Sequence, residues 1–323
     1  MTPRRDALRL RTAVVLLNLG GPLRGRDVEP FLLELFRDRD IIRLGPASLQ
    51  PLLARLVTTL RLGEVRARYA RIGGSPILRE TAAQAAALRQ ALREAGREEP
   101  VKLLFRYSPP RAGGLLRALA LQGVARILPV SLYPHACGAT TGSSLAELER
   151  AARVEGLDVL PGVRHYPTDP DYLACLEDNL RRTLALAPGA TVVFSAHGLP
   201  LRLVQSGDPY AREIEATVEA LKARLGDVPG GFRLAYQSRV GFVRWLEPSL
   251  GTVLGGLGGR DVVVVPLSFV GEHIETRYEL DIQYREVARR AGVRGYHRTA
   301  APGTHPSFIK CLARLAMEAL EQS

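Results

Sequence analysis

Short apolar runs alternate with amphipathic stretches along the whole chain of 323 residues. Apolar, β-branched runs predict strands, and stretches with a period near 3.6 predict helices between them. The strand-like runs are 13–19, 101–106, 127–132, 157–160, 191–195, 232–237, 262–267 and 293–297. The clearest helical patterns are 75–95, 141–153, 169–186, 208–225 and 305–320. This alternation predicts an α/β fold with parallel sheets and right-handed crossovers.

The eight predicted strands divide into two units of four, with the break in the proline-containing segment 161–167. The chain is also long for a single α/β domain. We therefore predict an N-terminal Rossmann-like domain, 1–163, and a C-terminal one, 164–323, each a four-stranded parallel sheet flanked by helices. An insertion at about 23–74 is expected to form a lip on the first domain. The last helix, at about 305–320, could pack back on that domain.

Two amphipathic stretches fill the insertion, PFLLELFRDRD and PLLARLVTTLRLGEVRARYARIGG. Their apolar positions alternate with Arg55, Arg61, Arg66 and Arg68. A packed helical hairpin is the simpler interpretation. The alternative is a lip that also touches an anionic membrane surface, because apolar residues beside arginines suit such an interface.

Polar residues follow one buried strand of the second unit. The β-branched run 262–265 is typical of a strand covered on both faces, and His273 and Glu275 come after its carboxyl end. Ligands bind at that edge of parallel sheets. From Glu275 onward, helical spacing would place Glu275, Glu279 and Gln283 on one face of a helix. A solvated helix face would show the same pattern, but the position at the sheet edge favours a site.

His197 ends another strand of the same unit, in TVVFSAHGLP, and could face Glu275 across a cleft. One imidazole and one carboxylate with open positions between them suit a borderline divalent ion such as Fe²⁺ that is bound and then released. Permanent zinc would recruit three or four ligands, and the sequence lacks HExxH. An imidazole with an ordinary pKa of about 6.5 would be mostly neutral near pH 7. A structural hydrogen-bonding histidine is the alternative interpretation.

The formal net charge is +11, and only three of the basic residues are lysine. Such a surface attracts anions, although a GC-rich genome or heat adaptation would give the same arginine bias. Nucleic acid is disfavoured as a partner, because the basic residues are scattered and no binding motif accompanies them. The three cysteines lack CxxC spacing, which argues against a disulfide framework and a cysteine-bound zinc or iron–sulfur site.

No apolar run reaches the roughly 18 residues of a membrane-spanning helix. The cysteine pattern indicates a reducing compartment. The sequence therefore predicts a cytoplasmic protein, with peripheral contact to the inner membrane through the lip as a further option.

Segments distributed over essentially the whole chain resemble, in order, those that mark ferrochelatases. They are LLNLGGP, RYARIGGSPI, FRYSPP, YPHACGATTGSS, FSAHGLP, GDPY, YQSRVGFVRWLEP and VPLSFVGEHIETRYELDIQY. The resemblance, to the bacterial type, implies a chelatase-like fold with a porphyrin cleft between two Rossmann-like domains. It also implies a lyase that inserts Fe²⁺ into a porphyrin in the last step of haem biosynthesis, with Fe²⁺ as substrate and no resident cofactor.

Site residues follow from the resemblance by position. It implies that His197 and Glu275 meet the metal, with His273 beside them as a third catalytic residue. Glu279 and Glu272 are placed on the path of protons or metal. The implied porphyrin-binding positions are Leu19, Tyr69, Ser75, Arg106, Tyr133 and Trp245.

Leu19 stands where family members that metallate coproporphyrin tend to have a tyrosine. The resemblance therefore implies protoporphyrin IX as the porphyrin and haem b as the product. Coproporphyrin III stays an alternative, because the many arginines could bind four propionates. A non-catalytic porphyrin- or metal-binding protein and a cobalt–sirohydrochlorin chelatase are the remaining alternatives. Gln283 stands where the family often has a third carboxylate on this polar face. Cys137 lies one place before the position of an iron–sulfur ligand in some relatives, and no group of cysteines follows near the C-terminus, so no iron–sulfur cluster is expected.

Overall fold

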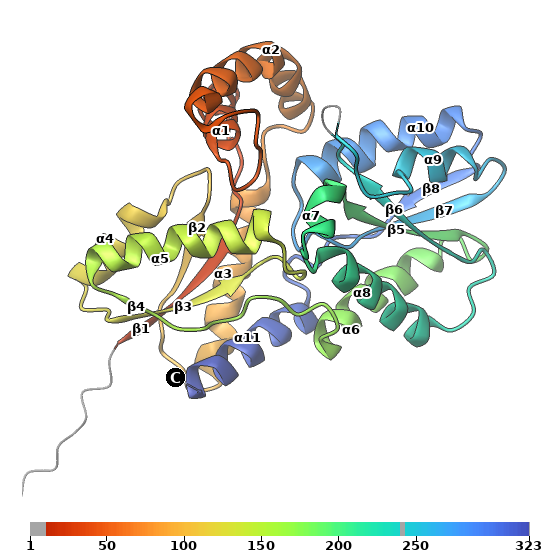
Figure 1. Cartoon of the computed structure of the whole chain (residues 1–323). Helices are drawn as coiled ribbons and strands as arrows, with labels where there is room; N and C mark the ends of the chain where they lie inside the picture. The colour runs from red at the N-terminus through yellow and green to blue at the C-terminus, as the bar shows by residue number, and fades with distance from the viewer. Residues whose placement is uncertain (1–10, 240–242, 323) are drawn as a thin grey trace, which may run out of the picture.

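Two parallel sheets stand side by side in the computed structural model, which describes residues 11–239 and 243–322 (Figure 1). The N-terminal sheet has the order β2-β1-β3-β4, and the C-terminal sheet repeats it as β6-β5-β7-β8. The strands are β1 (Thr12–Asn18), β2 (Val101–Phe105), β3 (Arg126–Ser131), β4 (Asp158–Val159), β5 (Thr191–His197), β6 (Phe232–Gln237), β7 (Asp261–Pro266) and β8 (Gly295–Arg298). The predicted α/β fold with two four-stranded sheets is confirmed.

Helices cover both faces of each sheet, which is why the central strands are apolar throughout. All seven residues of β1 are buried, as are the first six of β5. The flanking helices are α3 (Ile77–Glu94), α4 (Ala112–Leu121), α5 (Ser143–Glu155), α6 (Pro170–Leu184), α8 (Tyr210–Leu225) and α9 (Leu250–Gly255). The sequence patterns predicted α3, α5, α6 and α8 and missed α4 and α9. Both missed helices are short and contain glycines.

The last helix, α11 (Pro306–Glu321), runs from the C-terminal sheet to the N-terminal half and packs between α3 and α6 (Figure 1). One hydrophobic core therefore contains Leu16 and Leu88 of the N-terminal half together with Phe194 and Phe308 of the C-terminal half. A shared apolar core resists sliding between its parts. The packing of α11 thus fixes the two sheets, and the edges where polar residues gather, relative to each other.

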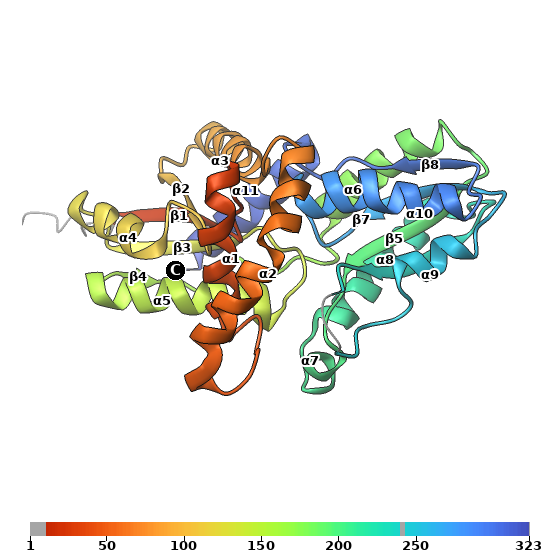
Figure 2. The same ribbon diagram turned by 90° about the horizontal axis from the view of Figure 1, so that it is seen from above.

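The insertion forms a helical hairpin, α1 (Val28–Arg37) packed on α2 (Gln50–Arg71), with short turns η1 (Gly25–Asp27) and η2 (Ala47–Leu49) beside them. Figures 1 and 2 show it standing on the end of the N-terminal half that faces the C-terminal half. Ile274 of the C-terminal half packs into the hairpin's own apolar cluster. Arg68 lies over the Tyr278 ring, with its guanidinium carbon 5.4 Å from the ring centre. The hairpin therefore covers the junction of the two halves.

The helix after β7 differs from the expected α-helix. Residues Glu275–Tyr284 form a wide π-helix, η4, and only then does the regular helix α10 (Arg285–Arg290) begin. The expectation of a 3.6-residue period from Glu275 was therefore wrong. π-Helices are rare in proteins. Where short π-helical turns occur inside α-helices, they often lie at functional sites.

Candidate active site

His197 is held by its backbone at the last residue of β5. Its N–H donates to Ser268 Oγ at 3.0 Å, and the Tyr210 hydroxyl donates to its carbonyl oxygen, also at 3.0 Å. In the sheet it lies opposite Gln237 at the end of β6. The side chain is 39% exposed. The backbone is thus fixed while the imidazole projects from the carboxyl edge of the sheet.

Glu275, the first residue of η4, meets this imidazole, with Oε2 at 2.6 Å from His197 Nδ1. Burial alone would raise the pKa of Glu275, but the charge and hydrogen bond of His197 outweigh burial and lower that pKa. Burial would lower the pKa of His197, but the negative charge of Glu275 raises it. The two shifts favour an imidazolium beside a carboxylate. The expectation of a mostly neutral imidazole, which assumed an ordinary pKa, does not fit this environment.

His273 lies on the other side of the same carboxylate, with Nε2 at 3.9 Å from Glu275 Oε1. The Phe269 ring lies 4.3 Å from the His273 ring and 6.4 Å from that of His197, centre to centre. Burial lowers the pKa of His273, and its Nδ1 is buried with no hydrogen-bond partner among the residues that the structure describes. The site thus pairs one histidine that favours the charged form with one that favours the neutral form. Phe269 was missed by the sequence analysis, although it follows β7 at the same sheet edge.

Glu279 is the second carboxylate of the cluster. Burial and the negative charge of Glu275 raise the pKa of Glu279 to about 7. The Ser238 hydroxyl lies 2.5 Å from Glu279 Oε2 and 2.8 Å from Glu275 Oε2, and Gln237 Nε2 donates to Glu279 Oε2 at 3.1 Å. The two carboxylates therefore converge on one hydroxyl. Gln283, the third polar position that the sequence placed here, is exposed.

Glu272 does not join this cluster. Its two oxygens accept hydrogen bonds from Arg298 at 3.0 and 3.1 Å, and Arg277 lies 3.2 Å away. The charge of Arg298 overcomes the effect of burial and lowers the pKa of Glu272. A carboxylate bound in this way supports the start of η4. The place of Glu272 on the path of protons or metal stays a prediction, and its ion-pair partners in the structure are arginines.

The lip supplies the wall opposite the carboxylates. Tyr69 of α2 is buried, and its pKa is raised by burial and by the charges of Glu275 and Glu279. Leu19, just after β1, packs with Ile274 against the apolar cluster of the lip that contains Tyr69. Two of the porphyrin positions implied by the resemblance thus lie on an apolar wall that faces the polar cluster.

Arg106 is occupied by protein carboxylates. Its Nη1 donates to Glu147 at 2.7 Å and its Nη2 to Asp38 at 2.5 Å, and its side chain is only 8% exposed. Both terminal nitrogens therefore already pair with carboxylates of the protein. In this structure Arg106 ties Asp38, just after α1, to the N-terminal sheet, and its contact with porphyrin stays a prediction.

The remaining implied positions are Ser75 between α2 and α3, Tyr133 after β3 and Trp245 after β6. Ser75 is buried, and a Cβ at Gly21 would lie only 2.5 Å from its hydroxyl, so a glycine is required where β1 leads into the lip. Tyr133 follows β3 and is half-buried. Trp245 forms a backbone bridge with Pro200, and a Cβ at Gly198 would lie 3.3 Å from its ring. The single tryptophan is thus beside the residue that follows His197.

The sequence matches the ferrochelatase family model over residues 11–320. A ferrochelatase from Geotalea uraniireducens is 43% identical over 313 residues, which cover 94% of this chain and 97% of the relative. One from a Picosynechococcus strain is 43% identical, with 97% of this chain and 83% of the relative covered. This chain belongs to the ferrochelatase family. It is a metal chelatase of the lyase class, and the family implies porphyrin and iron as its substrates.

Solved structures agree with this fold at low sequence identity. SirB from Bacillus subtilis, solved with Fe³⁺, superposes with a TM-score of 0.56 at 15% identity and covers 96% of each chain. CbiX, the terminal enzyme of sirohaem biosynthesis in denitrifying bacteria, gives a TM-score of 0.52 at 14% identity, covering 97% of this chain and 99% of that one. These likenesses concern the fold alone and confirm its chelatase-like architecture.

Side chains that can bind metals do not form a large group within the described residues. Within residues 11–239 and 243–322, the structure contains no group of three or more His, Cys, Asp or Glu side chains placed to hold a metal ion. Cys137, Cys175 and Cys311 are buried and free. His197 and Glu275, which meet at the sheet edge, carry one nitrogen and one oxygen donor group.

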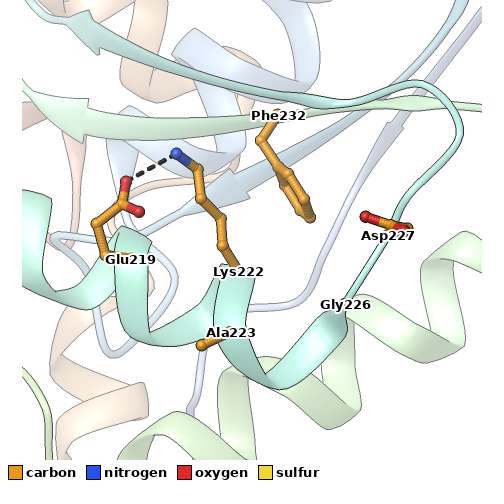
Figure 3. Close-up of a pocket in the computed structure, with 6 residues that line it drawn as sticks. All are labelled: Glu219, Lys222, Ala223, Gly226, Asp227 and Phe232. Atoms are coloured by element: carbon orange, nitrogen blue, oxygen red, sulfur yellow. Dashed lines mark hydrogen bonds and ion pairs between the residues drawn. The ribbon is translucent and has the colours of Figure 1, made fainter.

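A surface pocket near the end of α8 lies apart from this site (Figure 3). Lys222 pairs with Glu219 there at 2.7 Å, and Phe232 forms one wall. None of the candidate residues lines it. This pocket is therefore separate from the cluster of His197, Glu275 and Glu279 at the sheet edge.

Glu279→Gln is expected to change how stability depends on pH. Because its pKa is raised from 4.5 to about 7, Glu279 stabilises the fold most below pH 4.5, and this contribution is lost as the pH rises through 7. Each pKa unit corresponds to about 1.4 kcal/mol. The measured quantity is the melting temperature of the variant minus that of the parent, from thermal unfolding at pH 5 and at pH 8.5. This difference should be more favourable to the variant at pH 8.5 than at pH 5.

Glu286→Gln is the control for this experiment. The pKa of Glu286 is lowered to about 2 by Arg289 and Arg290, so it stays ionised over the whole window. The difference between this variant and the parent should be the same at pH 5 and pH 8.5. An equally flat difference for Glu279→Gln would contradict the raised pKa.

Proposed function

We propose that this ferrochelatase inserts Fe²⁺ into protoporphyrin IX to form haem b, with release of two protons. The observation that carries the proposal is the contact between His197 and Glu275 at the sheet edge, with Glu279 joined to it through Ser238. A cation needs negative charge and open ligands on arrival, and the pyrrole protons need acceptors as the metal enters. This cluster contains groups for both tasks.

The roles follow from the environments. Glu275 supplies negative charge and a metal-binding oxygen, and His197 offers an imidazole that releases its proton when it binds the metal. His273 favours the neutral form and accepts a pyrrole proton. Glu279, with a pKa of about 7, accepts and releases protons near neutral pH and continues the path toward solvent. Bending of the planar porphyrin, which exposes its nitrogen lone pairs, is assigned to the cleft walls with Trp245 and Tyr69.

Two features support protoporphyrin IX as the substrate. Leu19 is apolar and packs on the lip, which suits a porphyrin with fewer carboxylates. Arg106 already pairs with Asp38 and Glu147, so part of its positive charge is balanced by the protein. Coproporphyrin III, with four propionates, would need additional cations within the cleft.

The test supplies Fe²⁺ with each porphyrin in excess over the protein and follows metalloporphyrin formation under anaerobic conditions. We expect many turnovers, with a higher kcat/KM for protoporphyrin IX than for coproporphyrin III. A preference for coproporphyrin III would overturn the substrate assignment. Product limited to one equivalent of protein would instead indicate a porphyrin-binding protein, and a preference for Co²⁺ with sirohydrochlorin would indicate the other chelatase class.

We also propose that the lip contacts an anionic membrane surface. Leu52, Leu56 and Leu60 of α2 are 66%, 54% and 74% exposed, and their spacing of four residues places them on one face. Arg55 and Arg66 of the same helix are exposed. No helix of the described residues is long and apolar enough to cross a bilayer. Exposed leucines beside arginines suit insertion at the membrane interface.

Leu56→Glu combined with Leu60→Glu is expected to abolish binding to vesicles that contain anionic lipid at low salt, as measured by co-sedimentation. The carboxylates remove apolar area and are repelled by the lipid surface. Leu121→Glu, at an 82% exposed leucine of α4 outside the lip, is the matched control and should bind like the parent. Equal binding by all three proteins would contradict a role for the lip.

A further inference from the structure

Gln237 occupies an unusual place for an amide. It is completely buried at the end of β6, directly beside His197 in the sheet. A buried amide costs free energy unless all its polar atoms are paired, and an apolar residue would fill this place without that cost. The partners of the amide therefore indicate its purpose.

Three hydrogen bonds hold the Gln237 amide, and they involve both its oxygen and its nitrogen. The Ser195 hydroxyl donates to Oε1 at 2.7 Å, and Nε2 donates to the Glu275 carbonyl oxygen at 3.2 Å and to Glu279 Oε2 at 3.1 Å. Rotation of the amide by 180° would place Oε1 against two acceptors. The orientation is thus fixed, with Ser195 of β5 behind the amide and η4 in front of it.

Ser238, the next residue, lies in a strained conformation that supports the same carboxylate. The φ of Ser238 is 63°, in the left-handed region. Among the described residues, Ser238 is the only one other than glycine with a positive φ. Such strain persists where the surroundings enforce it and gathers at functional sites. The conformation brings the Ser238 hydroxyl within 2.5 Å of Glu279 Oε2, so two donors from adjacent residues converge on one oxygen.

We propose that Gln237 is a positioning residue for iron insertion: its amide, oriented by Ser195, holds the Glu279 carboxylate beside Ser238 and within reach of Glu275. The inference rests on the proposed function. Gln237 touches neither metal nor porphyrin in this assignment and acts through Glu279. Without it, the Glu279 side chain loses one of its two donors, and the first turn of η4 loses the tie at the Glu275 carbonyl.

The test is a double-mutant cycle with Gln237→Met, which keeps the volume and removes the hydrogen bonds, and Glu279→Ala. Each single variant is expected to lower kcat about 10-fold with little change in the KM for porphyrin. The double variant should lose little more than Glu279→Ala alone and clearly less than 100-fold, because only the tie at the Glu275 carbonyl is then left for Gln237→Met to break. Losses that multiply to about 100-fold, or a normal kcat for Gln237→Met, would overturn the inference.

Two further variants show whether a loss of kcat comes from the contact between Gln237 and Glu279 or from a general disturbance of the packing. Gln84→Met removes another buried amide, which donates to the carbonyl oxygens of Val270 and Gly303, and its effect on kcat should multiply with that of Glu279→Ala. Ser195→Ala keeps Gln237 and removes only its orienting donor, so it should show a smaller loss with the same coupling to Glu279→Ala. It replaces Gln237→Met if that variant does not fold. Absence of turnover in the parent protein would reject the proposed function, whereas multiplying losses in an active protein reject only this inference.

Discussion

His197→Ala is expected to lower kcat on the order of 100-fold or more while porphyrin still binds, because it removes the imidazole that meets Glu275 at 2.6 Å. In the proposed function, the His197 side chain supplies both a metal ligand and a proton-transfer group. Its backbone contacts with Ser268 and Tyr210 do not depend on the ring, so the strand end should keep its conformation. Steady-state kinetics with Fe²⁺, together with porphyrin binding followed by fluorescence, measure the two effects separately.

His165→Ala is the matched control. His165 Nδ1 lies 2.8 Å from Glu213, a histidine–glutamate contact of the same kind outside the site, and its side chain is 50% exposed. We expect its kcat to stay within about two-fold of the parent, as for most surface substitutions. Near-normal turnover in His197→Ala with an intact fold would return His197 to a structural role, and the metal would need a different ligand.

Glu275→Gln is expected to cause a loss of kcat on the order of 100-fold, together with a higher apparent KM for Fe²⁺. The amide is nearly isosteric but carries no charge, so the attraction for the cation is lost. The pKa of His197 should fall, since the charge of Glu275 is what raises it. The pH profile of any residual activity should therefore move to lower pH, which would not follow from a general loss of packing.

Glu272→Gln provides the comparison for this variant. Glu272 is three positions away, but its oxygens bind Arg298, so neutralising it breaks a buried ion pair. That change should lower the melting temperature more than it lowers kcat, whereas Glu275→Gln should do the reverse. Similar kinetic losses in both variants would mean that the charge of the whole segment matters and not the contact of Glu275 with His197.

The local patterns of the sequence were sufficient for the architecture. The central strands β1, β5 and β7 are runs of strand-forming residues, and the β-branched run in β7 indicated burial on both faces. Because parallel strands end at a common edge, the order of strands also placed His197 and Glu275 near each other. The resemblance to ferrochelatases then supplied their roles, and the family is confirmed by the comparisons.

The partners of the charged residues were decided by the tertiary structure. Glu272 and Glu275 are three positions apart in the same segment, but one binds Arg298 of β8 and the other His197 of β5. Arg106 was expected to bind porphyrin, and the structure pairs it with Asp38 after α1. No local pattern encodes these choices, because each depends on which distant residue the packing brings within about 3 Å.

The geometry of the helix after β7 shows the same division between sequence and structure. The spacing of Glu275 and Glu279 predicted a shared face, and the structure does bring the two carboxylates to one hydroxyl. That they do so through a π-helix, tied by Gln237 and met by the strained Ser238, could not be predicted from periodicity. The sequence determined which polar residues reach the sheet edge, since burial and period are local properties. The width of the helix and the pKa values of its carboxylates depend on contacts with β5, β6 and the lip, and those exist only in the folded protein.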